Sequence, residues 1–173
     1  MAQTKKMFER IIENAMYLCP KTPMYHGTWF EGDYQICSDG NRAIVIYNPV
    51  DVKARKEEYF TKVTPLFTDA EKNCKEEIQL PDIKDIKTAI NKLIGRRYKS
   101  ERVLYRLGDN SDLAVVNALY LYECMAALDA TTIKYDTQRP KKGMLLMETD
   151  IGKAILLPVR NETDRVGYWK GEV

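Results

Sequence analysis

Residues 37–47 read CSDGNRAIVIY, and this stretch decides how the chain is expected to fold. Its dipeptide Asp39-Gly40 favours a tight turn between two antiparallel strands. The run from Arg42 to Tyr47 is rich in β-branched residues, which is typical of a strand. Residues 24–38 precede the turn and predict two further extended segments. The first third of the chain is therefore expected to form an antiparallel sheet.

Three other stretches have the spacing of amphipathic helices. Apolar residues recur every three or four positions in residues 4–18, 82–94 and 117–129. Strands are expected at residues 101–107, 131–136, 143–148 and 153–159. No internal sequence repeat is evident. The pattern predicts an α+β fold, an antiparallel sheet with two or three helices packed on one face.

The region from residue 51 to residue 77 shows no clear period. Residues 51–60 predict a short helix, and residues 63–69 predict a loop. The segment is highly charged, so we expect an excursion on the surface. Residues 78–80 are expected to form a strand before Pro81.

Composition narrows the function classes. The chain has 173 residues and a formal net charge of +2, which suits one domain and gives no bulk attraction for nucleic acid. Its four cysteines form no C-x-x-C pair, and its one histidine has no neighbouring ligand, so neither a metal site nor a cofactor is expected. No catalytic motif is present, and we expect no enzymatic activity. Free thiols and the lack of a long apolar run predict a cytoplasmic protein without membrane contact.

Three stretches resemble the β sliding clamp of bacterial DNA polymerase III, the processivity factor of replication. CSDGNRA resembles the clamp's A-T-D-G-H-R-L-A turn, with Asp39, Gly40 and Arg42 matching. Residues 116–128 resemble its F-N-x-x-Y-L-x-x-A-L helix, and residues 154–160 resemble its terminal L-I-M-P-V-R strand. The resemblance implies a DNA-clamp-like fold. Residues 1–160 would form a single clamp-like domain with an insertion at about 51–99, followed by a polar tail at 161–173.

In the clamp family, helices carry basic side chains toward the phosphate backbone of double-stranded DNA. The positions that the resemblance would use for DNA here are Lys5, Lys6, Arg10, Lys84, Lys87, Lys92, Arg96 and Arg97. Residues 112–129 contain no lysine or arginine, so a DNA-lining role is not expected for that helix. The alternative is that the basic residues are only the solvated faces of surface helices.

Clamps also hold peptides of polymerases and other replication proteins in an apolar pocket. The positions matching that pocket are Ser38, Gly40, Asn41, Arg42, Pro158, Val159 and Arg160. In the family these parts belong to neighbouring domains, so a one-domain chain would need a homo-oligomer to complete the pocket. The alternative is that Asp39-Gly40 is only a turn and Pro158 only ends a strand.

The resemblance therefore predicts a non-enzymatic sliding-clamp-like module that associates with the DNA backbone, with replication-protein peptides, or with both. The alternative function is a protein-interaction or structural domain that keeps the clamp fold without binding DNA.

Overall fold

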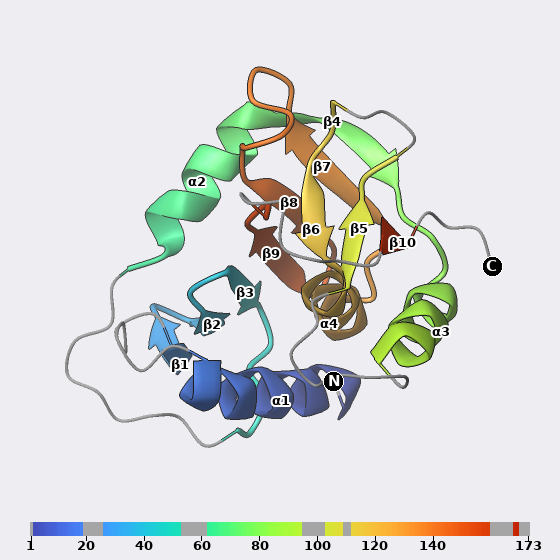
Figure 1. The fold of residues 1–173 in the computed structure, drawn as a ribbon. Coiled ribbons are helices and arrows are strands. Elements are labelled where there is room, and N and C mark those ends of the chain that lie inside the picture. The colour runs from blue at the N-terminus through green and yellow to red at the C-terminus, as the bar shows by residue number, and fades with distance from the viewer. Residues whose placement is uncertain are drawn as a thin grey trace.

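The computed structural model describes residues 2–18, 26–52, 62–94, 103–108, 112–159 and 168–169. Figure 1 shows their arrangement. In chain order the elements are α1 (Ala2–Leu18), β1 (His26–Glu31), β2 (Tyr34–Asp39), β3 (Arg42–Ile46), α2 (Thr64–Asn73), β4 (Cys74–Gln79), α3 (Ile83–Ile94), β5 (Leu104–Arg106), β6 (Val115–Asn117), α4 (Ala118–Leu128), β7 (Thr132–Asp136), β8 (Leu145–Glu148), β9 (Gly152–Leu156) and β10 (Tyr168–Trp169).

The main sheet has seven strands in the order β1-β2-β3-β9-β8-β7-β4. Every neighbouring pair is antiparallel. The strand after the Asp39-Gly40 turn, β3, lies at the centre beside β9, and Ile44 is opposite Ala154. The predicted α+β class with an antiparallel sheet is confirmed, and the two strands at its centre come from the stretches that suggested it.

The main sheet is built from two units with the same order of elements. Helix α1 is followed by the antiparallel strands β1, β2 and β3, and helix α4 is followed by the antiparallel strands β7, β8 and β9. The third strands of the two units pair with each other, so strand order runs outward from the centre in both directions. We call these units the first half and the second half. The order of one helix and three strands is therefore repeated in the structure, although the sequence shows no evident repeat.

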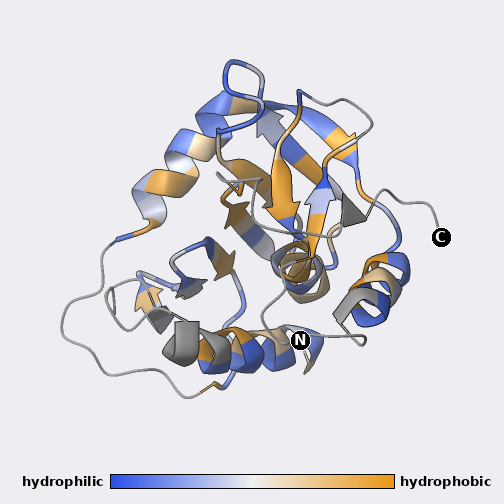
Figure 2. Ribbon diagram, in the orientation of Figure 1, coloured by the Kyte–Doolittle hydropathy of each residue, from blue (hydrophilic) through white to orange (hydrophobic). Residues whose placement is uncertain are grey.

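Helices α1, α3 and α4 share one hydrophobic core with one face of the sheet, which we call the helical side. Phe8 of α1, Ile86 of α3 and Leu121 of α4 are buried in this core together with Ile44 of β3. Helix α4 packs against both α1 and α3, and Figure 1 shows it above α1 and beside α3. In Figure 2, α4 is hydrophobic over most of its surface, whereas α1 has a hydrophilic outer face. Nine of the eleven α4 residues are buried, because helices and strands cover it on several sides.

A second, three-stranded sheet of order β10-β5-β6 extends the same core. Strand β6 runs directly into α4, and the side chain of Asn117 at their junction accepts a hydrogen bond of 2.9 Å from the backbone of Leu119. This N-cap satisfies one of the unpaired amides of the first helical turn. The apolar run before α4 therefore forms a strand, β6, that the sequence pattern did not reveal.

The opposite face of the main sheet carries helix α2, where the sequence pattern predicted a loop at residues 63–69. That prediction was wrong. Pro65 lies in the first turn, where a proline costs no helical hydrogen bond, and Phe67 and Ala70 are buried against the sheet. Most of the helix predicted at residues 51–60 lies outside the described residues.

The described part of the proposed insertion at about 51–99 is joined to the rest of the fold. Strand β4 pairs with β7 at the edge of the main sheet, and α3 packs against α4. In the predicted polar tail, Tyr168 and Trp169 form β10, which pairs in parallel with β5.

Candidate functional site

The Asp39-Gly40 corner is a turn held by its own side chains. One carboxylate oxygen of Asp39 accepts hydrogen bonds from the backbone nitrogens of Asn41 at 3.0 Å and Arg42 at 3.2 Å. The hydroxyl of Ser38 accepts from the backbone of Gly40 at 3.2 Å and donates to the carbonyl of Arg42 at 2.9 Å. Gly40 has a φ of 82°, a left-handed conformation that glycine adopts without strain.

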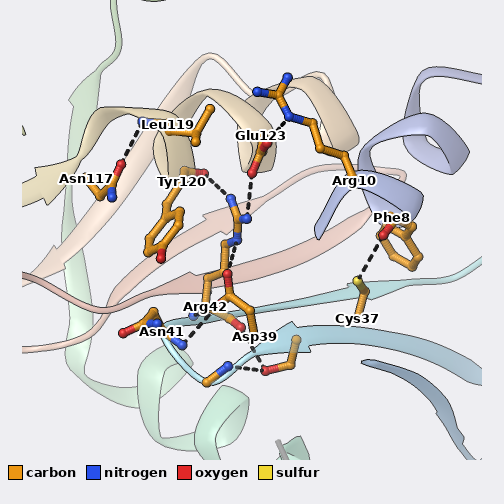
Figure 3. A network of polar contacts seen from close by, with 12 residues as sticks. Phe8, Arg10, Cys37, Asp39, Asn41, Arg42, Asn117, Leu119, Tyr120 and Glu123 are labelled. Carbon is orange, nitrogen blue, oxygen red and sulfur yellow. Dashed lines mark hydrogen bonds and ion pairs between the residues drawn. The ribbon is translucent and has the colours of Figure 1, made fainter. Parts of the chain in front are cut away.

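Arg42 is buried at the centre of an ion network, which Figure 3 shows from close by. Its Nε lies 3.1 Å from Oδ2 of Asp39, and its Nη2 lies 2.5 Å from Oε2 of Glu123. Its Nη1 donates to the carbonyl of Tyr120 at 3.3 Å, and its Cζ lies 4.3 Å from the centroid of the Tyr120 ring. Arg10 of α1 closes the network, with its Nε 2.7 Å from Oε1 of Glu123.

The network consists of charged side chains, most of which are buried. The side chains of Arg42 and Glu123 are fully buried, whereas that of Arg10 is about half exposed. Close ion pairs compensate the buried charges, since one oxygen of Glu123 faces Nη2 of Arg42 and the other faces Nε of Arg10. Burial alone would lower the pKa of Arg42, but the carboxylates of Asp39 and Glu123 raise that pKa above its ordinary value. Arg42 therefore stays charged and links β3 to α4.

Sequence reasoning missed the role of Glu123. It is the only charged residue in the otherwise apolar stretch of residues 117–128. A single carboxylate on a helix that is otherwise apolar enough to be buried needs a cationic partner inside the protein. The lone Glu123 in this apolar helix is therefore the sequence signal that predicts an arginine partner. The partner is Arg42, which the resemblance had assigned to peptide binding.

The closing strand passes directly beside the Asp39-Gly40 corner. The backbone nitrogen of Leu157 donates to the carbonyl of Asn41 at 3.0 Å, and that of Val159 donates to the carbonyl of Val115 at 2.8 Å. The structure thus places Gly40 and Asn41 in solvent near the half-buried Pro158 and Val159. Ser38 and Arg42 are buried and engaged within the protein, and Arg160 lies outside the described residues. The described parts of the predicted peptide pocket are adjacent within one chain, but the Arg42 side chain points inward to Asp39 and Glu123.

Six of the eight predicted DNA-contacting residues lie on α1 and α3. Lys6, Lys84, Lys87 and Lys92 are exposed, and Nζ of the half-exposed Lys5 lies 3.7 Å from a carboxylate oxygen of Asp51. Arg10 is bound to Glu123, and Arg96 and Arg97 lie outside the described residues. Exposed acidic residues accompany the basic ones, namely Glu9, Glu13, Asp82 and Asp85.

Three of the four cysteines lie within the described residues, and all three are free and buried, namely Cys37, Cys74 and Cys124. Burial raises the pKa of the Cys37 thiol well above its ordinary value. It also raises the pKa of Cys74 to about 11 and that of Cys124 to about 12. These thiols are protonated at neutral pH, which makes them poor nucleophiles and poor metal ligands. Within the described ranges, no three histidine, cysteine or acidic side chains gather as metal ligands would.

The comparisons with known proteins add no relative. Neither the protein-family models nor the curated proteins include a match to this chain. In the part of the chain that the structure describes, none of the helices combines the length and the apolar character that a membrane span requires.

Proposed function

We propose that the chain is a non-enzymatic, sliding-clamp-like module that associates with the backbone of double-stranded DNA through α1 and α3. The observation that carries the proposal is the placement of lysines on the helical side of the main sheet. Lys6 of α1 and Lys84, Lys87 and Lys92 of α3 all project into solvent from helices that flank α4.

The fold supports the same proposal. Two of the three stretches that resemble the clamp, the Asp39-Gly40 corner and the closing strand, are hydrogen-bonded neighbours in one antiparallel sheet. A helix–phosphate contact of this kind is independent of DNA sequence, because it releases condensed counterions and reads no bases. With a net charge of only +2, the attraction must come from local placement of lysines.

The test is a DNA titration at several salt concentrations with charge-reversed variants. Fluorescence anisotropy with a labelled duplex should give a log–log salt slope of about −3.6 if Lys6 and the three α3 lysines each neutralise a phosphate. Replacing Lys84, Lys87 and Lys92 with glutamate should abolish binding at low salt. The matched control reverses Lys62, Lys72 and Lys142, which are also exposed but lie outside α1 and α3. Equal losses in both triple variants would leave only a general charge effect and would refute the proposal.

A second candidate is a protein-interaction or structural domain that keeps this fold without DNA contact. The acidic residues beside the lysines favour it, since Glu9, Glu13, Asp82 and Asp85 offset much of the positive charge on α1 and α3. No wild-type binding to the duplex at low salt would select this candidate. Light scattering after gel filtration would give the number of subunits, and a ring requires several copies. A cytoplasmic location belongs to either candidate, and the three buried free thiols support it.

A further inference from the structure

The outer edge of strand β5 is occupied by the chain's own C-terminal segment. Tyr168 and Trp169 form β10, which pairs in parallel with β5, and Tyr168 is opposite Leu104. Figure 1 shows β10 beside β5, on the side away from β6. The DNA proposal uses α1 and α3 and no residue of this sheet, so the two proposals can fail separately.

The hydrogen bonds of β5 show which of its backbone groups face this edge. Toward β6, the carbonyl of Val103 accepts a hydrogen bond of 2.8 Å, and the backbone nitrogen of Leu107 donates one of 3.0 Å. Because the direction alternates along a strand, Tyr105 also faces β6. Leu104 and Arg106 therefore direct their backbone N–H and C=O groups the other way, toward β10.

The register makes Trp169 the central residue of this pairing. In a parallel pair, a residue bonds to the two residues that flank its partner. Trp169 lies opposite Tyr105. Its N–H therefore faces the carbonyl of Leu104, and its C=O faces the N–H of Arg106. Tyr168 alternates with Trp169 and directs its own N–H away from β5.

The tail reaches β5 by crossing the second sheet from one edge to the other. The backbone nitrogen of Val159 donates to the carbonyl of Val115 at 2.8 Å, on the side of β6 away from β5. Three strand spacings, roughly 14 Å in all, separate this edge from β10. The eight residues from 160 to 167 can span up to about 28 Å. The tail is therefore long enough to reach β5 of its own chain.

Strand β5 is held firmly, whereas β10 is held by little. Leu104 and Leu107 are completely buried, and Val103 and Tyr105 are nearly so. By contrast, β10 pairs over two residues. A parallel pairing this short opens at a low cost in free energy. Once opened, the edge of β5 presents the backbone groups that an extended polypeptide binds in β-strand addition.

We propose that the outer edge of β5 is a binding site for an extended polypeptide segment, and that the C-terminal tail occupies this site as an autoinhibitory strand. A partner polypeptide reaches the site only by displacing the tail. A tail on a short linker has an effective concentration in the mM range at β5, so it excludes weak competitors. Recognition is through the backbone, so the partner segment has no proline at the position that Trp169 occupies.

The first test breaks the pairing by removing one N–H group. Trp169→Pro removes the donor that faces β5, whereas Tyr168→Pro is the matched control, because an edge strand tolerates proline where the N–H points away. Amide hydrogen exchange of Arg106 should become at least tenfold faster in Trp169→Pro and change little in Tyr168→Pro. The Tyr105 amide faces β6, so its unchanged exchange confirms that the second sheet is folded. Unchanged Arg106 exchange in Trp169→Pro would overturn the proposal.

The second test supplies the tail as a separate molecule. A synthetic peptide of residues 161–173 is titrated into the Trp169→Pro protein and into wild type, and binding is followed by amide NMR shifts. The peptide should bind the variant at least tenfold more tightly than wild type, with the largest shifts at Leu104 and Arg106. A peptide that itself carries Trp169→Pro is the control and should not bind. Equal affinity for the two proteins, or no binding to the variant, would refute an autoinhibited site.

Light scattering tests which chain supplies the strand. A tail that pairs within its own chain leaves the number of subunits the same in wild type and in Trp169→Pro. An oligomer that Trp169→Pro dissociates would show that the tail pairs with a second copy, and autoinhibition within one chain would be wrong.

Discussion

The two halves of the main sheet have the same elements but differ in what their helices do. In the first half, α1 buries Met7, Phe8 and Ile11 and presents charged residues to solvent. In the second half, α4 is buried on nearly every side and carries a single charge, Glu123. The difference shows that the packing around each helix determines whether the helix carries charged or apolar residues. A helix covered by α1, α3 and β6 has no face left for lysines, so the DNA contact proposed above uses α1 and α3 and not α4.

The halves also differ where their third strands begin. Strand β3 begins with Arg42, whose long side chain crosses to Glu123 on the helix of the second half. Strand β9 begins with Gly152, where an added Cβ would lie 2.0 Å from the carbonyl oxygen of Val45 on β3. The first half thus extends a charged side chain from β3 to the helix of the second half. At the start of β9, the absence of a side chain lets β9 lie close to β3.

The largest expected loss of stability comes from removing Glu123, whose ion pair with Arg42 joins the two halves. Glu123→Ala leaves Arg42 buried with only one carboxylate, and we expect the free energy of unfolding to fall by about 3–5 kcal/mol in urea denaturation. Glu13→Ala on the exposed face of α1 is the control and should change it by less than about 0.5 kcal/mol.

The double variant Arg42→Met with Glu123→Leu sharpens this comparison. It removes the buried Arg42–Glu123 pair as a unit and leaves the Asp39 carboxylate with its two backbone hydrogen bonds, so it should be more stable than Glu123→Ala alone. A Glu123→Ala protein as stable as the control would show that the network does not hold the two halves together.

A smaller loss is expected at the start of β9. In Gly152→Ala, the methyl group must displace the backbone of Val45 or Ile46, and we expect a loss of about 2–3 kcal/mol in the same assay. Gly32→Ala provides the comparison, because its added methyl meets no atom within 4 Å and suffers only from a φ of 63°. That variant should lose about 1 kcal/mol. If Gly32→Ala were the more damaging change, close approach of β3 and β9 would not explain Gly152.

The smallest expected loss of stability concerns an acidic residue at the end of the first strand of each half, Glu31 in β1 and Asp136 in β7. Partial burial raises the pKa of Glu31, but hydrogen bonds from Thr64, Val63 and Trp29 outweigh it and bring that pKa below 4.5. At the same position in the second half, Asp136 accepts from the backbones of Gln138 and Arg139 in its own loop. Glu31 therefore holds a separate helix, α2, whereas Asp136 closes a local turn.

Glu31→Gln should cost about 1 kcal/mol at neutral pH, the usual value of a helix cap. Because the folded-state pKa is lowered, this stabilisation is complete above the unfolded value of 4.5 and disappears as the pH falls through the lower folded value. The difference in Tm between wild type and Glu31→Gln should therefore shrink in acid. A difference that grows as the pH falls would contradict the assigned direction of the pKa.

Local sequence patterns predicted those parts of the fold that depend on neighbouring residues. Helices α1, α3 and α4 follow from their apolar periods, and the Asp39-Gly40 turn follows from side chains within three positions. Helix α2 was missed because Pro65 favours a loop locally, while the carboxylate that caps the helix comes from Glu31 in another element. The resemblance assigned Arg42 to peptide binding, and local sequence could not reveal its burial because its partner Glu123 is distant in sequence.

Alkylation of the three buried thiols can be used to follow unfolding. Cys37 lies in the first half and Cys124 in the second, whereas Cys74 lies on the α2 face. A thiol that is enclosed and protonated reacts with an alkylating reagent only when the structure around it opens. The rate at which Cys74 is alkylated relative to Cys37 and Cys124 would therefore record which face of the main sheet opens first, without adding any probe to the protein.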